Sequence, residues 1–303
     1  MPSRFRLGLT LLLTPILLAL LLDRLFPLPL PDVTRDATTI VLARDGTPLR
    51  AFSGYQGVWR YPVTHDEVSP LYLEALLNYE DRWFYSHAGV NPVAMMRAVA
   101  QAIWHQEIIS GGSTLTMQVA RLLENIPHTP AGKFRQMARA LQLEWHLDKN
   151  EILTLYLNHA PYGGTLQGVQ AASYAYLGKP VAELSHAEAA LLTVLPQAPS
   201  RLRPDRWPER AQRARDKVLN RMAALNVWQD ETVIDAMIET VSARHLQNPM
   251  HAPLAAERLR RSYPEKRRIT STLDAELQTR IETRVSDWVN RLPARTSAAV
   301  IVA

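Results

Sequence analysis

The chain of 303 residues carries a formal net charge of +5 and contains no cysteine. The absence of cysteine excludes disulfide bonds, thiol nucleophiles and metal sites built on thiolates. The basic residues are spread along the chain and are not interleaved with aromatic side chains, which favours contact with anionic lipid or phosphate over binding of nucleic acid.

The N-terminus predicts a transmembrane helix. Two arginines precede an apolar run from Leu7 to Leu22, and Asp23 and Arg24 close this run. Because the run is near the shortest length that spans a bilayer, a cleaved signal peptide is the alternative. No small-x-small cleavage site follows, which favours an uncleaved signal anchor with the N-terminus inside and the rest of the chain outside.

Beyond the anchor, the sequence predicts a mainly α chain with a small β segment near its start. Strands are predicted at 38–43 and 49–52 around the turn Asp45-Gly46, and helices from about residue 65 to 240. The predicted helix starts are Ser69-Pro70, Asn91-Pro92, Ser113, Ser185 and Pro208. The remaining predictions are a linker at 241–268, a strand at 269–273, a helix at 274–289 and a strand at 297–303.

Glu80 is the first candidate for chemistry. Leu73, Leu76 and Leu77 form an apolar stripe on one face of a predicted helix, and Glu80 lies on the same face at its end. A carboxylate beside an apolar stripe is partly desolvated, and desolvation makes it a stronger base. The alternative is a helix C-terminus with ordinary solvated charges, which local sequence alone favours.

A second candidate is a glycine-containing loop that leads into a helix. Gly112 and Ser113 come just before a predicted helix N-terminus, where free N–H groups suit an anion. Thr114, Gln118 and Arg121 follow as a polar stripe on one helix face. The alternative is an ordinary loop and cap, and the missing Gly-Lys-Ser/Thr ending excludes a phosphate loop of the nucleotide type.

A basic cluster is the third candidate. Lys133, Arg135 and Arg139 lie on one predicted helix with Gln136 among them. Cations in such a cluster can hold a pyrophosphate, and the alternative is a solvated basic face.

Together these segments resemble a known family. The segments 80–89 (Glu-Asp-x-x-Phe-x-x-His-x-Gly), 111–118 (Gly-Gly-Ser-Thr-x-Thr-x-Gln), 149–158 and 189–200 are similar, in this order, to the motifs of family 51 glycosyltransferases. These are the glycan-polymerising domains of class A penicillin-binding proteins. The resemblance covers about residues 40–225, and within the class Met117, Arg121 and the segment 161–168 are most similar to the 1C type.

The resemblance implies a lysozyme-like fold that polymerises lipid II into β-1,4 glycan. Glu80 would remove the proton from the acceptor's 4-hydroxyl, and undecaprenyl pyrophosphate would leave with inversion. The substrate-binding residues it implies are Asp81, Phe84, His87, Gly112, Ser113, Thr114, Gln118, Arg121, Lys133, Arg135 and Gln136. Arg121, Lys133 and Arg135 are the expected cations for the pyrophosphate. No cofactor is required, and a divalent cation (magnesium or manganese) is allowed.

The resemblance also implies a location and partners. The expected location is the bacterial inner membrane, with a single span and the catalytic domain on the periplasmic side. The expected partners are lipid II, the growing glycan, the membrane and other cell-wall synthesis proteins, without nucleic acid. The predicted segments are 1–26 (cytoplasmic tip and anchor), 27–64 (linker and β segment), 65–240 (glycosyltransferase domain) and 241–303 (linker and start of a transpeptidase domain).

Gln136 departs from the family pattern. The family motif Arg-Lys-x-x-Glu would place a glutamate at Gln136 and an arginine at Gly132. An amide can donate and accept hydrogen bonds but carries no charge. A pyrophosphate leaving group needs charge stabilisation more than a proton, so a competent enzyme is favoured over a degenerate site. On this reasoning Gln136→Glu is expected to leave activity equal or higher.

The C-terminal segment adds a further expectation. Residues 269–278 resemble the entry to a penicillin-binding transpeptidase domain, and the sequence ends soon after, which predicts an incomplete α/β piece. No Ser-x-x-Lys tetrad occurs in the sequence, so this chain is expected neither to cross-link peptides nor to bind penicillin covalently. Two other functions remain open: a lysozyme-type glycan hydrolase, and a non-catalytic membrane-anchored scaffold that binds lipid II or cell-wall partners.

Overall fold

A computed structural model describes residues 14, 17–18, 20–31, 38–54, 57–105, 112–243, 250–292, 298 and 300. It confirms a mainly α chain with a few short strands. The chain forms two compact units: the first contains the N-terminal residues up to Pro31 together with Glu80–His159, and the second contains Asp32–Tyr79 together with Ala160–Ala303.

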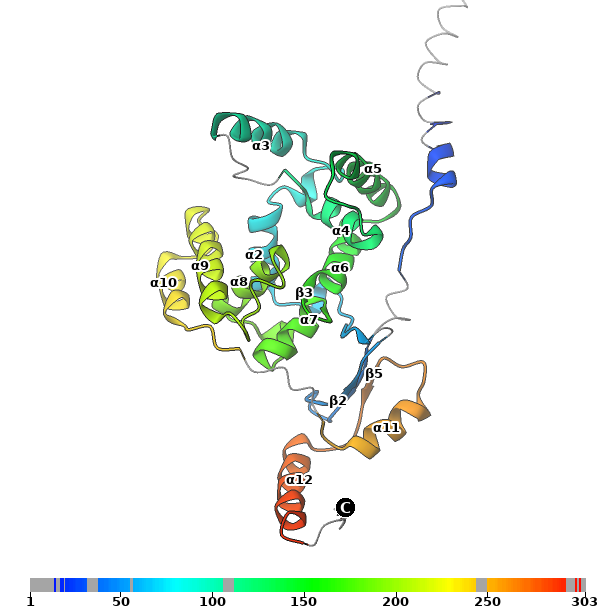
Figure 1. The fold of residues 1–303 in the computed structure, drawn as a ribbon, viewed down its shortest axis with the longest axis vertical. Helices are drawn as coiled ribbons and strands as arrows, with labels where there is room; N and C mark the ends of the chain where they lie inside the picture. The colour runs from blue at the N-terminus through cyan, green and yellow to red at the C-terminus, as the bar shows by residue number, and fades with distance from the viewer. Residues whose placement is uncertain are drawn as a thin grey trace, which may run out of the picture. The chain divides into compact units, whose positions relative to one another are not determined.

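The first unit is helical. Its elements are a 3₁₀ turn η3 (Phe84–Ser86) and the helices α3 (Pro92–His105), α4 (Leu115–Glu124), α5 (Pro130–His146) and α6 (Lys149–His159). Helix α4 packs against both α5 and α6 (Figure 1). The predicted start at Asn91-Pro92 is confirmed, whereas the predicted cap Ser113 is one residue early. Thr114 is the N-cap of α4, because its hydroxyl oxygen accepts the Met117 N–H.

The N-terminal residues of this unit contact α5. Residues 20–25 are helical. Asp23 Oδ1 accepts hydrogen bonds from Gln142 Nε2 at 2.7 Å and His146 Nε2 at 2.8 Å. The carbonyl oxygen of Phe26 accepts from Arg139 Nη1 at 2.6 Å. We call these contacts of Asp23 and Phe26 with α5 the N-terminal clasp.

The predicted anchor at 7–22 lies largely outside the described residues. Among the helices that are described, none is both long and apolar enough to cross a bilayer.

The second unit contains a three-stranded sheet of order β2-β1-β5. Strand β1 (Thr39–Leu42) pairs antiparallel with β2 (Pro48–Phe52) and parallel with β5 (Arg268–Thr270). The two predicted N-terminal strands are confirmed, and β5 overlaps the predicted strand 269–273. The sheet thus joins strands from two segments, 27–64 and 241–303, that the sequence places apart. The domain boundaries themselves stay a prediction.

Helix α11 (Pro253–Ser262) corrects the prediction of an irregular linker at 241–268. Its residue Ala256 is fully buried against Val41 of β1 and Ile269 of β5, and Leu259 packs against the same cluster. The apolar face of α11 is short and its other side is rich in arginine. The helical spacing of its apolar residues is therefore hard to detect in the sequence. The predicted strand at 297–303 lies outside the described residues, apart from 298 and 300.

The rest of the second unit is mostly helical. Its helices are α2 (Pro70–Glu80, whose last residue belongs to the first unit), α7 (Val169–Ala172), α8 (His186–Val194), α9 (Pro208–Ala224), α10 (Asp230–Ile238) and α12 (Ala275–Val289). Its short elements are β3 (Pro161–Gly163), β4 (Leu166–Gln167), the 3₁₀ turns η2 (His65–Glu67), η5 (Val181–Glu183) and η6 (Leu195–Gln197), and the π-helical turn η4 (Ser173–Leu177).

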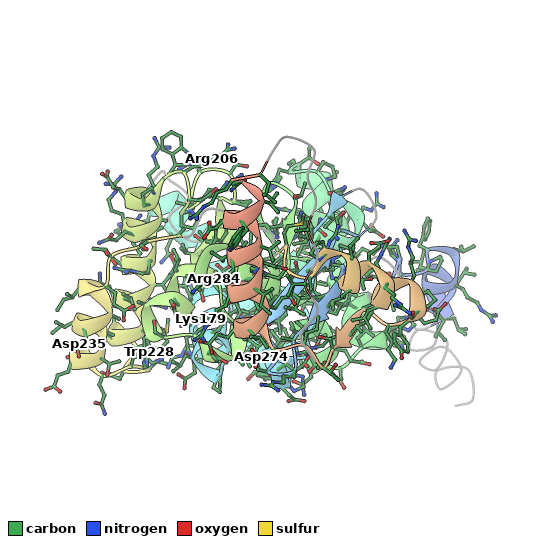
Figure 2. All side chains as sticks on the ribbon, turned by 90° about the horizontal axis from the view of Figure 1, so that it is seen from below. Lys179, Arg206, Trp228, Asp235, Asp274 and Arg284 are labelled. Carbon is green, nitrogen blue, oxygen red and sulfur yellow. The ribbon has the colours of Figure 1, made fainter. Side chains whose placement is uncertain are left out.

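Side chains cap helices in this unit, and the cap predicted at Ser185 is confirmed. Helix α9 packs against α8 and α10 (Figure 1). Ser185 makes the predicted capping box of α8 with Glu188. Asp274 caps α12, and Figure 2 labels this residue together with Arg284 on the same helix.

Candidate active site

A loop between α2 and α3 is tied to the N-terminus of α4. The buried carboxylate of Asp81 accepts the backbone N–H of Leu115 at 2.9 Å and His87 Nε2 at 3.0 Å. The buried hydroxyl of Thr114 donates to the carbonyl oxygen of Gly89. Three predicted site residues, Asp81, His87 and Thr114, therefore hold the loop 81–89 in place through contacts within the chain.

Lys149 and Glu144 support this loop from behind. Lys149 Nζ donates to the His87 carbonyl oxygen at 2.7 Å and to Glu144 Oε1 at 2.6 Å, and it lies 4.5 Å from the ring centroid of the buried Phe84. Thr116 of α4 donates to the same Glu144 oxygen. Sequence reasoning left these two residues out of the site, although Lys149 opens the third segment of the family resemblance.

Position 89 requires a glycine for two reasons: its backbone conformation and the closeness of the α5 backbone. Its φ is +82°, and a Cβ there would lie 2.6 Å from the carbonyl oxygen of Ala140 in α5. We expect Gly89→Ala to destabilise the fold by at least about 1–3 kcal/mol, the cost of a strained backbone, plus the clash with the α5 backbone. The free energy of unfolding, measured by denaturant titration, checks this.

Gly46→Ala is the matched control for that measurement. Gly46 has a similar φ of +86° but nothing within 4 Å of its Cβ position. The difference between the two variants in the loss of unfolding free energy measures the cost of the clash between a side chain at position 89 and the α5 backbone. Equal losses would mean that this clash costs no stability.

Glu80 and Gln118 are brought together. Glu80 ends α2 and is partly exposed, and Gln118 Nε2 of α4 donates to its Oε2 at 2.9 Å. The fully buried residues on α2 are Tyr72, Ala75 and Leu76. The predicted stripe of Leu73, Leu76 and Leu77 is therefore only partly right, because Leu73 and Leu77 are half-buried. The carboxylate of Glu80 combines partial solvent access with a fixed orientation, as a base requires.

Two cations face one neutral oxygen between α4 and α5. Lys133 Nζ lies 3.3 Å from Gln136 Oε1, and Arg121 Nη2 lies 3.2 Å from the same atom. Lys133 also donates to the hydroxyl of Ser113. Within the described ranges, neither cation contacts a carboxylate, and the buried Nε of Arg121 has no hydrogen-bond partner. We call Lys133 and Arg121 the cation pair.

Gly112 allows a close approach beside this site. A Cβ on Gly112 would lie 3.2 Å from the Cα of Met95 in α3. The glycine therefore lets the segment before α4 pass close to α3. The next residue, Ser113, accepts the hydrogen bond from Lys133.

Arg135 does not join the cation pair. It forms an ion pair with Glu124 at 2.8 Å, and the other oxygen of Glu124 pairs with Arg139 at 2.6 Å. The predicted basic cluster thus divides into two groups. Arg135 and Arg139 share a carboxylate, whereas Lys133 and Arg121 pair with no carboxylate of the described residues.

The pKa of Lys133 reflects this arrangement. Burial lowers the pKa of its ammonium group below the ordinary lysine value, and the nearby charge of Arg121 lowers it further. Both effects disfavour the charged form, and a bound anion would relieve the repulsion between the two cations. The pair therefore has the electrostatics of an anion subsite.

The side chains around the cation pair do not fit a divalent metal. They are two cations, a hydroxyl and an amide, whereas Mg²⁺ and Mn²⁺ prefer carboxylate oxygens. No group of three or more His, Cys, Asp or Glu side chains that could hold a metal occurs in the described part of the chain. The divalent cation that the sequence allows stays a prediction.

Comparison with known proteins identifies related chains. A model of the family described as transglycosylase matches residues 45–223. The chain is 58% identical over 280 residues to penicillin-binding protein 1C of Escherichia coli (strain K12), an alignment that covers 92% of this chain and 36% of that protein. It is 35% identical over 260 residues to penicillin-binding protein 1A of Pseudomonas aeruginosa (strain PAO1), covering 82% of this chain and 31% of that protein.

The chain therefore spans about a third of the length of these curated relatives. A crystal structure of penicillin-binding protein 1A from Haemophilus influenzae aligns with 87% of this chain and 31% of that chain, at a TM-score of 0.41 and 20% identity, which is too weak a likeness to support an inference. The family match covers more than half of the chain and contains Glu80, Gln118, the cation pair and Gln136. By these matches, the chain belongs to the transglycosylase family.

Proposed function

We propose that this chain is a peptidoglycan glycosyltransferase that polymerises lipid II into β-1,4 glycan strands and releases undecaprenyl pyrophosphate. One observation carries the proposal: α4 presents Gln118, which holds Glu80, one turn before Arg121, which faces Lys133. Three residues of helix correspond to about 4.5 Å along the axis. A base and an anion subsite are thus anchored on neighbouring turns of one helix, as transfer of a sugar from a pyrophosphate requires.

In the proposed reaction, Glu80 removes the proton from the acceptor's 4-hydroxyl. The oxygen forms a bond to the anomeric carbon of the donor as the bond from that carbon to the pyrophosphate oxygen breaks. The two electrons of the broken bond stay on the pyrophosphate, whose charge Lys133 and Arg121 stabilise without donating a proton. Attack from the face opposite the leaving group gives the inverted, β-1,4 linkage.

The proposal includes a membrane location. The apolar run 7–22 would be a single-pass anchor in the bacterial inner membrane, with a lysozyme-like catalytic domain on the periplasmic side. Lipid II, the growing glycan and other cell-wall synthesis proteins would be the partners. The N-terminal clasp supports this arrangement, because it ties the end of the apolar run to the helix that carries Lys133.

The test is incubation of the full chain in detergent with labelled lipid II, followed by gel separation of the products. The expected result is a ladder of glycan chains that lysozyme digests. Absence of polymer under varied detergent and metal conditions would overturn the proposal and favour a scaffold that only binds lipid II. Cleavage of finished glycan without polymerisation would instead identify a hydrolase.

The low pKa of Lys133 gives an expected pH dependence of polymerisation. The charged form binds the leaving group, so the rate should fall as the pH rises through the pKa of Lys133, which lies below the ordinary lysine value. Arg121→Met removes one cause of the low pKa and should move this alkaline limb to higher pH, although the variant is slower. A pH–rate profile of both proteins measures the shift. If the alkaline fall in rate lies at the same pH in both, Lys133 does not control it.

A further inference from the structure

The side-chain amide of Gln136 makes hydrogen bonds through both its nitrogen and its oxygen. The side chain lies on α5 and is only 1% exposed. Its Nε2 donates to the carbonyl oxygen of Met117 in α4, and its Oε1 accepts from Lys133 and Arg121. One buried amide therefore bridges the two helices and also holds the cation pair.

Only an uncharged group that is both donor and acceptor suits these contacts. An ionised glutamate offers two acceptors, so one oxygen would face the Met117 carbonyl, which is itself an acceptor. Its other oxygen would pair with Lys133 and Arg121 and cancel part of their charge. A protonated glutamate would need to keep its proton beside two cations, which favour the ionised form.

We infer that Gln136 is a positioning residue that sets the net charge of the anion subsite, because it orients the cation pair on a neutral oxygen. The subsite keeps two positive charges and so matches an anion with at least two negative charges, such as a pyrophosphate ester. This inference rests on the proposed function for its natural ligand. It also reverses the expectation from the sequence that Gln136→Glu leaves activity equal or higher.

Binding of inorganic pyrophosphate to the full chain in detergent, measured by calorimetry across a pH series, tests the inference without turnover. The charged groups that face the amide oxygen are Lys133 and Arg121, and His128 contacts Arg121. Gln136→Glu should weaken binding about 10–100-fold near neutral pH, the scale of a hydrogen bond to a charged group. The same variant should move the alkaline loss of binding to higher pH, since a carboxylate raises the pKa of Lys133.

Gln136→Met separates charge from structure. Methionine fills a similar volume without either hydrogen bond, so it should cost stability and, because the cation pair is held less firmly, some pyrophosphate affinity. Its loss of affinity should be smaller than that of Gln136→Glu, and the pH at which binding falls on the alkaline side should not move. Gln229→Glu, at the exposed N-cap of α10, adds the same charge elsewhere and should bind as wild type.

Three results would overturn the inference. The first is that wild type does not bind pyrophosphate, and the second is that Gln136→Glu binds it as tightly as wild type. The third is that the glutamate and methionine variants lose equal affinity and that neither changes the pH at which binding falls on the alkaline side. The proposed function can fail separately. If wild type binds pyrophosphate with the expected pattern but makes no glycan from lipid II, the polymerase proposal fails and the role of Gln136 stands. If wild type makes glycan and Gln136→Glu binds and polymerises equally well, only the inference fails.

Discussion

Replacing Glu80 with glutamine should lower the rate of glycan polymerisation by about 10²–10⁴-fold, the usual contribution of a general base. Glutamine keeps the shape of the side chain, and its carbonyl oxygen can still accept the hydrogen bond from Gln118. It cannot take a proton at neutral pH, so the acceptor hydroxyl loses its base. Gel quantification of glycan chains from labelled lipid II measures the loss.

The control for this variant is Asp235→Asn, which makes the same change of charge at an exposed position on α10 (Figure 2). It should leave the rate unchanged. Unfolding curves for Glu80→Gln should match wild type, because the partner of Gln118 is retained. A Glu80→Gln variant that polymerises at the wild-type rate would remove Glu80 from the mechanism.

Replacing Lys133 with methionine should lower polymerisation by about 10²–10³-fold, the cost of removing one group that stabilises transition-state charge. Methionine keeps an apolar stem of similar length and removes only the ammonium group. Because the leaving pyrophosphate gains charge as the bond breaks, the loss should appear mainly in kcat. Initial rates over a range of lipid II concentrations separate kcat from KM.

Arg135→Met is the matched comparison, since it removes a positive charge two residues away on the same helix. Arg135 is exposed and already paired with Glu124, and Arg139 would keep Glu124 paired in its absence. Its effect should be smaller than that of Lys133→Met by at least about tenfold. Equal losses would return Arg135 to the anion subsite, where the sequence places it.

Local signals in the sequence account for most of the helix starts and for the three strands β1, β2 and β5. Prolines and capping residues at Ser69-Pro70, Asn91-Pro92 and Ser185 act over three or four residues, so they can be recognised without tertiary information. Helix α11 could not be recognised in this way, because its buried face is set by packing on β1 and β5. Strand β5 was predicted, but its parallel partner β1 is more than 200 residues earlier, and local pattern carries no information on such pairing.

The candidate site shows the same division. The order of the motifs indicates Glu80 and Gln118, and the structure brings them within 2.9 Å. Charge pattern grouped Lys133 with Arg135, whereas the fold groups Lys133 with Arg121 and assigns Arg135 to Glu124. Which cations are paired with a carboxylate depends on where Glu124 lies in space, and residue spacing does not encode that position.

Under the proposed function, the N-terminal clasp has a consequence for how a lipid-linked substrate would reach the site. Gln142, which holds Asp23, is nine residues from Lys133 on the continuous helix α5, a separation of about 14 Å along the axis. If the apolar run ends at the bilayer surface, the backbone of Lys133 lies about 14 Å along α5 from the contact made there, which places the cation pair near the headgroup layer. A pyrophosphate could then be captured at the depth where it already resides, with its hydrocarbon tail still dissolved in the leaflet. Encounter would be a search by lateral diffusion in two dimensions, and the enzyme would not need to extract its substrate into water.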